Sequence, residues 1–414
     1  MLKTTECHAQ SIMDKADILA RFSCDEGALT RGYLTKEHKA AHQQLAIWME
    51  EAGLTTWEDS VGNQWGRKVA SNPDAPTVII GSHSDTVTNA GKYDGNLGIL
   101  LGIESLKQLS HHEFPFNIDV VAFADEEGLR FDTTLIGSSA VAGQFNAQWF
   151  DIKDSEGITM AQAMQDFGLL PSKAGLDCRD PKETLAYLEV HIEQGPVLEA
   201  QDLAVGVVTG IAGAKRFKLD VSGVAGHAGT VPLPLRHDAL CAVAEMISTI
   251  ETYAKENDIV ATVGKCDVKK GGAVNVIPGD VSFTIDIRSL EQTKLESACE
   301  HLLEQLESIA EYRNVDLGCE QIYQADAVKC AQSLQSLWGN AVEVVTQSSP
   351  YFLPSGAGHD ALAMQHLTNV GMLFVRCEKG ISHNPKEAVM TEDVQVALQC
   401  MMEMLLQIES NSPQ

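Results

Sequence analysis

The chain has 414 residues, which exceeds the usual length of about 100–200 residues for one domain and predicts two. Hydrophobic residues make up 44% and charged residues 21%, and these ordinary globular proportions exclude a disordered or collagen-like chain. Thirty Lys and Arg against 57 Asp and Glu give a net charge of −27. Because such a charge repels phosphate backbones and anionic membranes, we expect neither a nucleic-acid partner nor a membrane partner.

The sequence features that bear on the cellular compartment favour the cytoplasm. The first residues show no basic segment followed by an apolar one, and no apolar stretch reaches the roughly 20 residues of a spanning helix. Ten cysteines are scattered without any C-x-x-C pair, which favours reduced thiols over a disulfide framework. We therefore expect a cytoplasmic protein.

Strands and helices alternate in the first half of the chain and again near its end. Predicted strands cover 77–81, 118–124, 185–192, 203–208, 342–346 and 370–375. Helical spacing covers 97–109, 137–145, 161–167, 330–337, 359–366 and 393–408. This alternation is typical of an α/β domain with a mostly parallel sheet flanked by helices.

Within residues 211–328, the order of strands and helices differs from the alternation in the rest of the chain. Strands are predicted over 216–221, 259–267, 281–288 and 315–323, and helices over 235–254 and 292–312. The resulting β-α-β-β-α-β order is that of a ferredoxin-like unit. We therefore expect a catalytic α/β domain formed by 1–210 and 329–414, with a ferredoxin-like α+β domain inserted as 211–328.

Acidic and imidazole side chains follow the predicted strands. His83 and Asp85 come directly after the strand at 77–81, and Asp94 stands at the start of the next helix. Such groups at the carboxyl end of a parallel strand can converge on one cation. Alternatively, Asp94 caps the helix and His83 is a hydrogen-bonded strand-end histidine.

Further groups of this kind follow the other strands. The strand at 118–124 ends in three acidic residues, two of which, Glu126 and Glu127, could divide proton transfer and metal ligation, although a solvated loop would also explain them. His191 and His383 again follow apolar strands. Together, His83, Asp94, Glu127, His191 and His383 predict a divalent-metal site. Five ligands with one shared carboxylate suit two ions, and nitrogen and oxygen donors favour Zn, Mn or Co.

The segment 211–328 carries groups suited to an anionic substrate. His227 lies in a glycine-rich stretch whose N–H groups could meet a developing oxyanion, unless it is an ordinary hairpin turn. Arg216, Asn275 and Arg288 add cationic and amide donors, although Arg288 could be a plain surface residue. Elsewhere, Gly-Ala-Gly at 356–358 lacks the further glycine of a dinucleotide fingerprint.

These motifs together resemble the M20-type metal-dependent amidohydrolases. The resemblance rests on Gly-Ser-His-Ser-Asp-Thr (81–86), Tyr-Asp-Gly-Asn-Leu-Gly (93–98), Asp-Glu-Glu-Gly-Leu-Arg-Phe (125–131), His-Ile-Glu-Gln-Gly-Pro (191–196), Gly-His-Ala-Gly-Thr (226–230), Ser-Gly-Ala-Gly-His-Asp-Ala (355–361) and Gly-Ile-Ser-His-Asn-Pro (380–385). The motifs at 191–195 and 355–360 are similar to the branch of allantoate deiminases and N-carbamoyl-L-amino-acid hydrolases. Segments 131–137 and 371–377 look particularly like allantoate deiminases.

The resemblance implies a homodimer with two divalent ions per subunit, Zn or Mn, and an inserted domain that serves as dimerisation domain and lid. Asp94 would bridge the ions, Glu126 would be the general base, and His227 would donate to the oxyanion in its own or the partner's site. The groups that would hold a small anionic ureido substrate are Gln194, Arg216, His227, Asn275, Arg288, Gly356 and Gly358.

The implied reaction is metal-dependent hydrolysis of the ureido C–N bond of allantoate to ureidoglycine, ammonia and carbon dioxide, in purine and allantoin nitrogen catabolism. Hydrolysis of N-carbamoyl-L-amino acids or of ureidoglycolate is the alternative. A third hypothesis is a peptidase, or a catalytically silent binding protein that keeps the fold.

Overall fold

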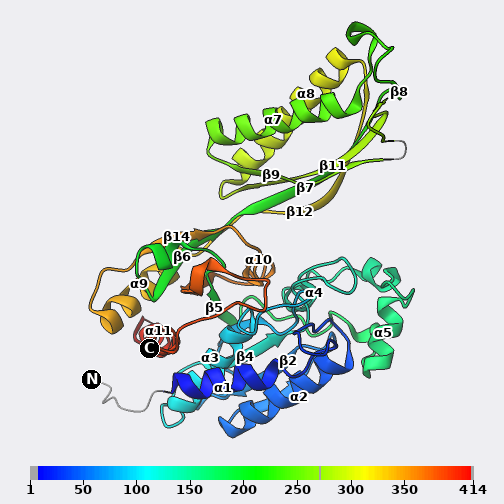
Figure 1. Ribbon diagram of the computed structural model, residues 1–414. Coiled ribbons are helices and arrows are strands. Elements are labelled where there is room, and N and C mark those ends of the chain that lie inside the picture. Colours follow the sequence, from blue (N-terminus) through cyan, green and yellow to red (C-terminus); the bar gives the residue numbers. More distant parts are fainter. Residues whose placement is uncertain (1–7, 270–271, 412–414) are drawn as a thin grey trace. The chain divides into compact units, whose positions relative to one another are not determined.

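The computed structural model describes residues 8–269 and 272–411, which form two compact units (Figure 1). The first unit contains the described residues up to Thr209 and from Cys330 onward, and the second is Gly210–Lys329. Each unit has its own hydrophobic core.

A mixed sheet forms the centre of the first unit, in the order β1-β2-β4-β3-β5-β15-β6 with β14 paired to β6. The short strand β13 pairs with the last two residues of β6, and these paired residues belong to the second unit. Four central strands, β4, β3, β5 and β15, run parallel, and the strands that flank them pair antiparallel. Helices surround this sheet, so the predicted α/β class is confirmed. The strands are β1 Thr55–Glu58, β2 Gln64–Lys68, β3 Thr77–His83, β4 Asn117–Phe123, β5 Thr184–Ile192, β6 Val205–Ile211, β13 Val328–Lys329, β14 Phe352–Ser355 and β15 Val370–Val375.

Helix α3 packs closely against this sheet, and its residues 96–106 are all buried. Gly98 and Gly102 allow the close approach, because a Cβ at Gly98 would overlap the carbonyl oxygen of Val190 in β5. This packing fixes the loop before α3 at the carboxyl ends of the central strands. The helices of the unit are α1 Ala9–Leu19, α2 Lys36–Glu51, α3 Asn96–Gln108, α4 Ile136–Val141, α5 Met160–Phe167, α6 Val197–Ala200, α9 Gln332–Thr346, α10 Ala361–Met364 and α11 Thr391–Asn411, with short 3-10 turns η1 Ala147–Asp151, η2 Pro171–Lys173 and η4 Glu378–Gly380.

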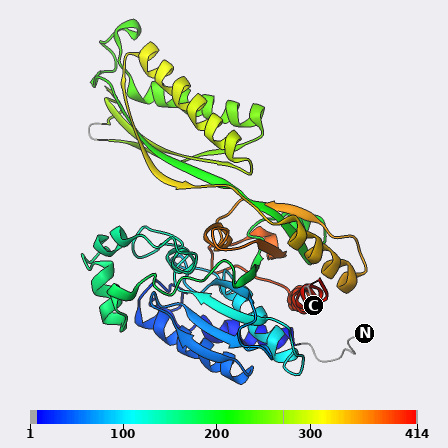
Figure 2. The same cartoon turned by 180° about the vertical axis from the view of Figure 1, so that it is seen from behind.

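The second unit is a four-stranded antiparallel sheet with two helices on one face, seen from both sides in Figures 1 and 2. Its strand order is β12-β7-β11-β9, the ferredoxin-like arrangement that the sequence predicts. Phe217, Leu219 and Val221 alternate along β7 into the core beneath the helices. The elements are β7 Gly213–Ser222, α7 Ala239–Asn257, β9 Val260–Val268, β11 Asp280–Ser289, α8 Gln292–Arg313 and β12 Asp316–Ala325, with a small ribbon of β8 Gly226–His227 and β10 Val276–Ile277 and a turn η3 Leu233–Leu235.

One strand prediction is wrong. Residues 342–346 form the last turn of α9 rather than a strand. Trp338, Ala341 and Val342 are buried in the core at helical spacing, so tertiary packing outweighs the β preference of the valines in this segment. Within the described residues, no helix is both long enough and apolar enough to cross a bilayer.

Candidate metal centre

The carboxyl ends of the parallel strands bring five predicted ligands together. His83 ends β3, His191 lies near the end of β5, and Glu127 follows β4. Asp94 precedes α3, and His383 follows β15 and η4. Because parallel strands end at one edge of the sheet, residues 300 positions apart in the chain can share a site.

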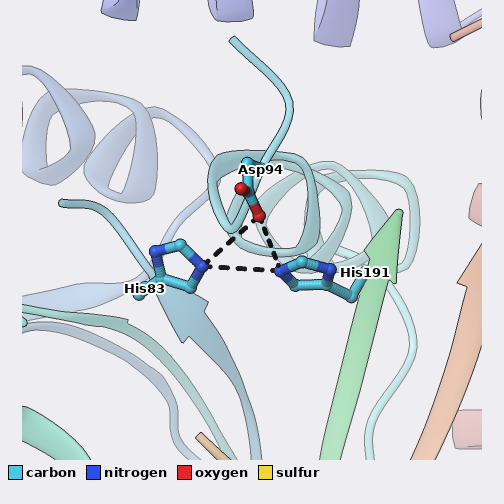
Figure 3. A group of neighbouring side chains, drawn as sticks. All are labelled: His83, Asp94 and His191. Atoms are coloured by element: carbon cyan, nitrogen blue, oxygen red, sulfur yellow. Dashed lines mark hydrogen bonds and ion pairs between the residues drawn. The ribbon is translucent and has the colours of Figure 1, made fainter. Parts of the chain in front are cut away.

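The first ligand group consists of His83, Asp94 and His191, all of which are buried (Figure 3). The Oδ1 atom of Asp94 lies 3.7 Å from Nε2 of His83 and 3.2 Å from Nε2 of His191. The two Nε2 atoms are 3.4 Å apart. Three donor atoms therefore face a common point.

The second group consists of Asp94, Glu127 and His383. Nε2 of His383 lies 3.1 Å from Oδ2 of Asp94 and 3.4 Å from Oε1 of Glu127. Burial would raise the pKa of Asp94, but hydrogen bonds with His191, His383 and His83 lower it well below its ordinary value. An ionised Asp94 thus offers one oxygen to each group.

The ring nitrogens of the two buried histidines fit a metal ion. Nδ1 of His83 lies 3.1 Å from the Asp85 carbonyl oxygen, and Nδ1 of His191 lies 2.9 Å from the Ile192 carbonyl oxygen. A carbonyl only accepts, so each Nδ1 carries a proton and Nε2 is the atom that each ring turns toward Asp94. Burial opposes a charged ring, but hydrogen bonds with carboxylates, Asp94 among them, raise the pKa of His83 and His191. A divalent ion at this point would take the place of the protons that the two rings share with Asp94. Nitrogen and oxygen donors without thiolate suit Zn or Mn.

The turn after β4 is held by Asp85. Its Oδ1 accepts the N–H of Glu126 at 2.9 Å, and its Oδ2 accepts the N–H of Glu127 at 3.1 Å. Oδ1 also lies 3.5 Å from Nδ1 of His83. His83, Glu126 and Glu127 form a third cluster of donor atoms. Burial raises the pKa of Glu126 to about 7, and burial together with Glu126 raises the pKa of Glu127.

Three predicted substrate-binding residues lie in the first unit. Nε2 of Gln194 is 3.1 Å from both carboxylate oxygens of Asp94. A Cβ at Gly358 would lie 3.3 Å from Oε1 of Glu126, whereas one at Gly356 would meet open space. The structure therefore brings Gln194 to Asp94 and Gly358 to Glu126.

The other predicted residues belong to the second unit and form two pairs there. Nε of Arg216 lies 2.9 Å from one oxygen of Asp286, and Nε of Arg288 lies 2.8 Å from the other. His227 lies in β8, and the next residue donates its N–H to the carbonyl oxygen of Asn275 at 2.9 Å. That these four residues bind substrate stays a prediction.

Glu189 and His359 lie beside the ligands but were not predicted from the sequence as site residues. Glu189 is fully buried and accepts hydrogen bonds from the Ser82 hydroxyl and the Ala361 N–H, both at 3.1 Å. The ring of His359 packs edge-on against His191, with centroids 4.5 Å apart. An acidic residue within an apolar strand, two positions before His191 and thus on the same face, is a signal that could have identified Glu189.

A buried set of nitrogen and oxygen ligands at the strand ends of an α/β unit, with the carboxylate of Glu126 beside it, defines a hydrolase of the metal-binding kind. Residues 79–407 match the model of Peptidase family M20/M25/M40, and the chain belongs to this family. This finding confirms the resemblance that the sequence motifs carry.

Among the curated relatives that are 40% identical to the chain are two enzymes with different names. One is the N-carbamoyl-L-amino acid amidohydrolase of Geobacillus stearothermophilus, aligned over 385 residues that cover 92% of this chain and 94% of the relative. The other is the allantoate deiminase of Arabidopsis thaliana, aligned over 410 residues that cover 91% of this chain and 78% of the relative. The crystal structure of an amidase of the hydantoinase/carbamoylase family from Burkholderia multivorans matches with a TM-score of 0.89 and 30% identity over 98% of each chain. The chain is thus a hydrolase that acts on carbon–nitrogen bonds.

Proposed function

We propose that this protein is a metal-dependent allantoate deiminase, which hydrolyses the ureido C–N bond of allantoate to ureidoglycine, ammonia and carbon dioxide. The observation that carries the proposal is the pair of ligand groups that share Asp94, with Glu126 beside them. The substrate is taken from the relationship to allantoate deiminase at 40% identity. Such an enzyme serves purine and allantoin nitrogen catabolism, and the sequence prediction places it in the cytoplasm.

Two divalent ions, Zn or Mn, complete the centre in this proposal. His83, Asp94 and His191 would hold one, and Asp94, Glu127 and His383 would hold the other. A metal pair bound in this way polarises a carbonyl group and lowers the pKa of water.

Glu126 acts as general base and then as general acid. Its carboxylate accepts a proton from the attacking water and returns that proton to the nitrogen that leaves the ureido carbon. The Gly358 loop passes close to Oε1 of Glu126, so backbone without a side chain leaves room for the planar ureido group there.

The anionic groups of the substrate are held by cationic and amide donors. The residues proposed for this role are Gln194, Arg216, His227, Asn275, Arg288 and the 356–358 loop. A guanidinium group matches a carboxylate with two parallel hydrogen bonds, and His227 donates to the oxyanion.

The protein forms a homodimer through its second unit. The β9 strand ends the four-stranded sheet on one side, and Val260 and Val268 on it expose 59% and 43% of their surface. An open sheet edge with exposed valines is a surface that pairs with another strand.

N-carbamoyl-L-amino acids are the second candidate substrates. The Geobacillus relative that is named for this activity matches the chain as closely as the plant deiminase does, and over a larger share of its own length. The same ligands and the same Glu126 would serve, because both substrates present a ureido carbon and a carboxylate.

Ammonia release by the purified protein, loaded with Mn or Zn, tests the proposal. The substrate panel contains allantoate, ureidoglycolate and a set of N-carbamoyl-L-amino acids. We expect the highest kcat/KM with allantoate. Turnover of carbamoyl amino acids alone would favour the second candidate, and the absence of turnover with every substrate would reject both.

A further inference from the structure

Glu387 is a buried acidic residue in an otherwise exposed loop. It follows His383 by four positions, and residues 383–386 between them are exposed. Glu387 itself is only 3% exposed. Glu387 was not predicted from the sequence as a site residue, and it is not a member of either ligand group.

The carboxylate of Glu387 joins two loops that are far apart in the chain. Its Oε1 accepts the backbone N–H of Tyr93 at 2.9 Å and that of Asp94 at 3.1 Å. Its Oε2 accepts the hydroxyl proton of Ser382 at 2.9 Å. One side chain therefore holds both the residue that carries the shared carboxylate and the neighbour of His383.

Gly91 confirms how closely the first loop lies against Glu387. A Cβ at this position would overlap the carboxyl group of Glu387. The loop can reach the carboxylate only because position 91 lacks a side chain, which leaves Glu387 little room for another rotamer.

The Ser382 hydroxyl links Glu387 to the metal ligands directly. Its oxygen lies 3.3 Å from Oδ2 of Asp94, which is longer than the distance to Glu387. A hydroxyl has one proton to donate, and the shorter contact assigns that proton to Glu387. The Ser382 hydroxyl then does not compete with an ion for Oδ2 of Asp94.

We propose that Glu387 is a positioning residue of the metal centre, which holds Asp94 and His383 in their ligating arrangement before any ion binds. The inference rests on the proposed metal centre. Ligand side chains that are already ordered lose less conformational freedom when the ion binds. Residues that hydrogen-bond to metal ligands typically contribute about 10–100-fold to metal affinity.

The test is isothermal titration of the chelator-treated protein with Mn²⁺, for the wild type and for Glu387→Gln. The amide keeps one acceptor for the backbone N–H groups but loses the second, together with the charge. We expect Mn²⁺ to bind about 10–100-fold more weakly. Activity should recover at saturating Mn²⁺, because a positioning defect raises the metal requirement rather than removing a reacting group.

Two further variants keep the test decisive. Ser382→Ala removes only the Oε2 partner, and we expect a smaller loss of Mn²⁺ affinity in a fold that remains intact. Asp59→Asn is the matched control, since Asp59 is also buried, accepts two backbone N–H groups on one oxygen and touches no ligand. It should lower the melting temperature without changing Mn²⁺ affinity.

The outcomes distinguish the proposed metal centre from the positioning role of Glu387. Wild-type protein that binds no Mn²⁺ would overturn the proposed metal centre and this inference with it. Wild-type binding with unchanged affinity in Glu387→Gln and Ser382→Ala would overturn the role of Glu387 alone. Equal losses of affinity in Glu387→Gln and Asp59→Asn would reduce Glu387 to a residue of general structural importance.

Discussion

The metal ligands of the first unit and the predicted substrate residues of the second unit are fixed in different ways. His83, His191 and Asp94 are buried. Backbone carbonyl oxygens hold the two histidine rings, and the carboxylate of Glu387 accepts the backbone N–H of Asp94. Arg216 and Arg288 have side chains that are 42% and 27% exposed, and they are held by one carboxylate, that of Asp286.

This difference indicates which functional side chains the fold holds rigidly in place. Ligand atoms that must meet within a few ångströms need rigid strand ends and a second layer of hydrogen bonds. Side chains that capture a flexible anionic substrate tolerate partial exposure, because charge attracts over longer distances. Changes in the first unit should therefore affect turnover, and changes in the second unit should affect substrate binding.

Metal removal should have the largest effect. We expect chelation to abolish turnover and to destabilise the first unit, since an ion at 1,000 times its Kd stabilises the folded state by about 4 kcal/mol. The second unit has no ligand group among its described residues, so its unfolding should not shift. Calorimetry of chelated and Mn-loaded protein measures the unfolding transitions of both units. Equal shifts of the two melting temperatures would contradict the expected difference between the units.

Glu126→Gln should have the next largest effect. The amide is nearly isosteric but cannot accept the proton of water, so we expect kcat to fall by about two to four decades. Bound metal, measured by plasma mass spectrometry, should remain close to the wild-type content because Glu126 belongs to neither of the two proposed ion positions. If Glu126→Gln turned over substrate at nearly the wild-type rate, Glu126 would not be the general base.

Arg288→Ala should act on binding more than on turnover. Loss of one charge-assisted contact costs about 1.5–3 kcal/mol, which corresponds to a KM that is about 10–150-fold higher. Lys218→Ala is the control, because Lys218 lies on β7 with its side chain exposed. A fall in kcat with an unchanged KM would place Arg288 outside the substrate site.

The sequence predicts the second unit well because its pattern is strong. Buried and less buried positions alternate along β11, and its observed bounds, Asp280–Ser289, extend the predicted strand by one residue at each end. The valines near 342–346 mislead because their helical burial depends on a core that local sequence does not reveal. In this segment, packing in the core outweighs the β-strand preference of the individual valines.

The ligand residues could be proposed one by one from strand ends, but their division into groups could not. Which oxygen of Asp94 faces His191 and which faces His383 depends on the strand order β3-β5-β15. Glu387 was missed for a related reason. An acidic residue in a polar loop is indistinguishable from a solvated one until its backbone partners, 294 and 293 positions away, are known.

Arg216→Lys should have the smallest effect and thereby tests how far the second unit tolerates change. The guanidinium of Arg216 lies 4.4 Å from the ring centroid of Tyr323 as well as beside Asp286. Lysine keeps the charge but loses the planar stacking, which is worth about 0.5–1 kcal/mol at an exposed site. We expect KM to rise by about two- to fivefold, with kcat and Mn²⁺ affinity unchanged. A loss as large as that of Arg288→Ala would show that the planar guanidinium of Arg216, rather than its charge, holds the substrate.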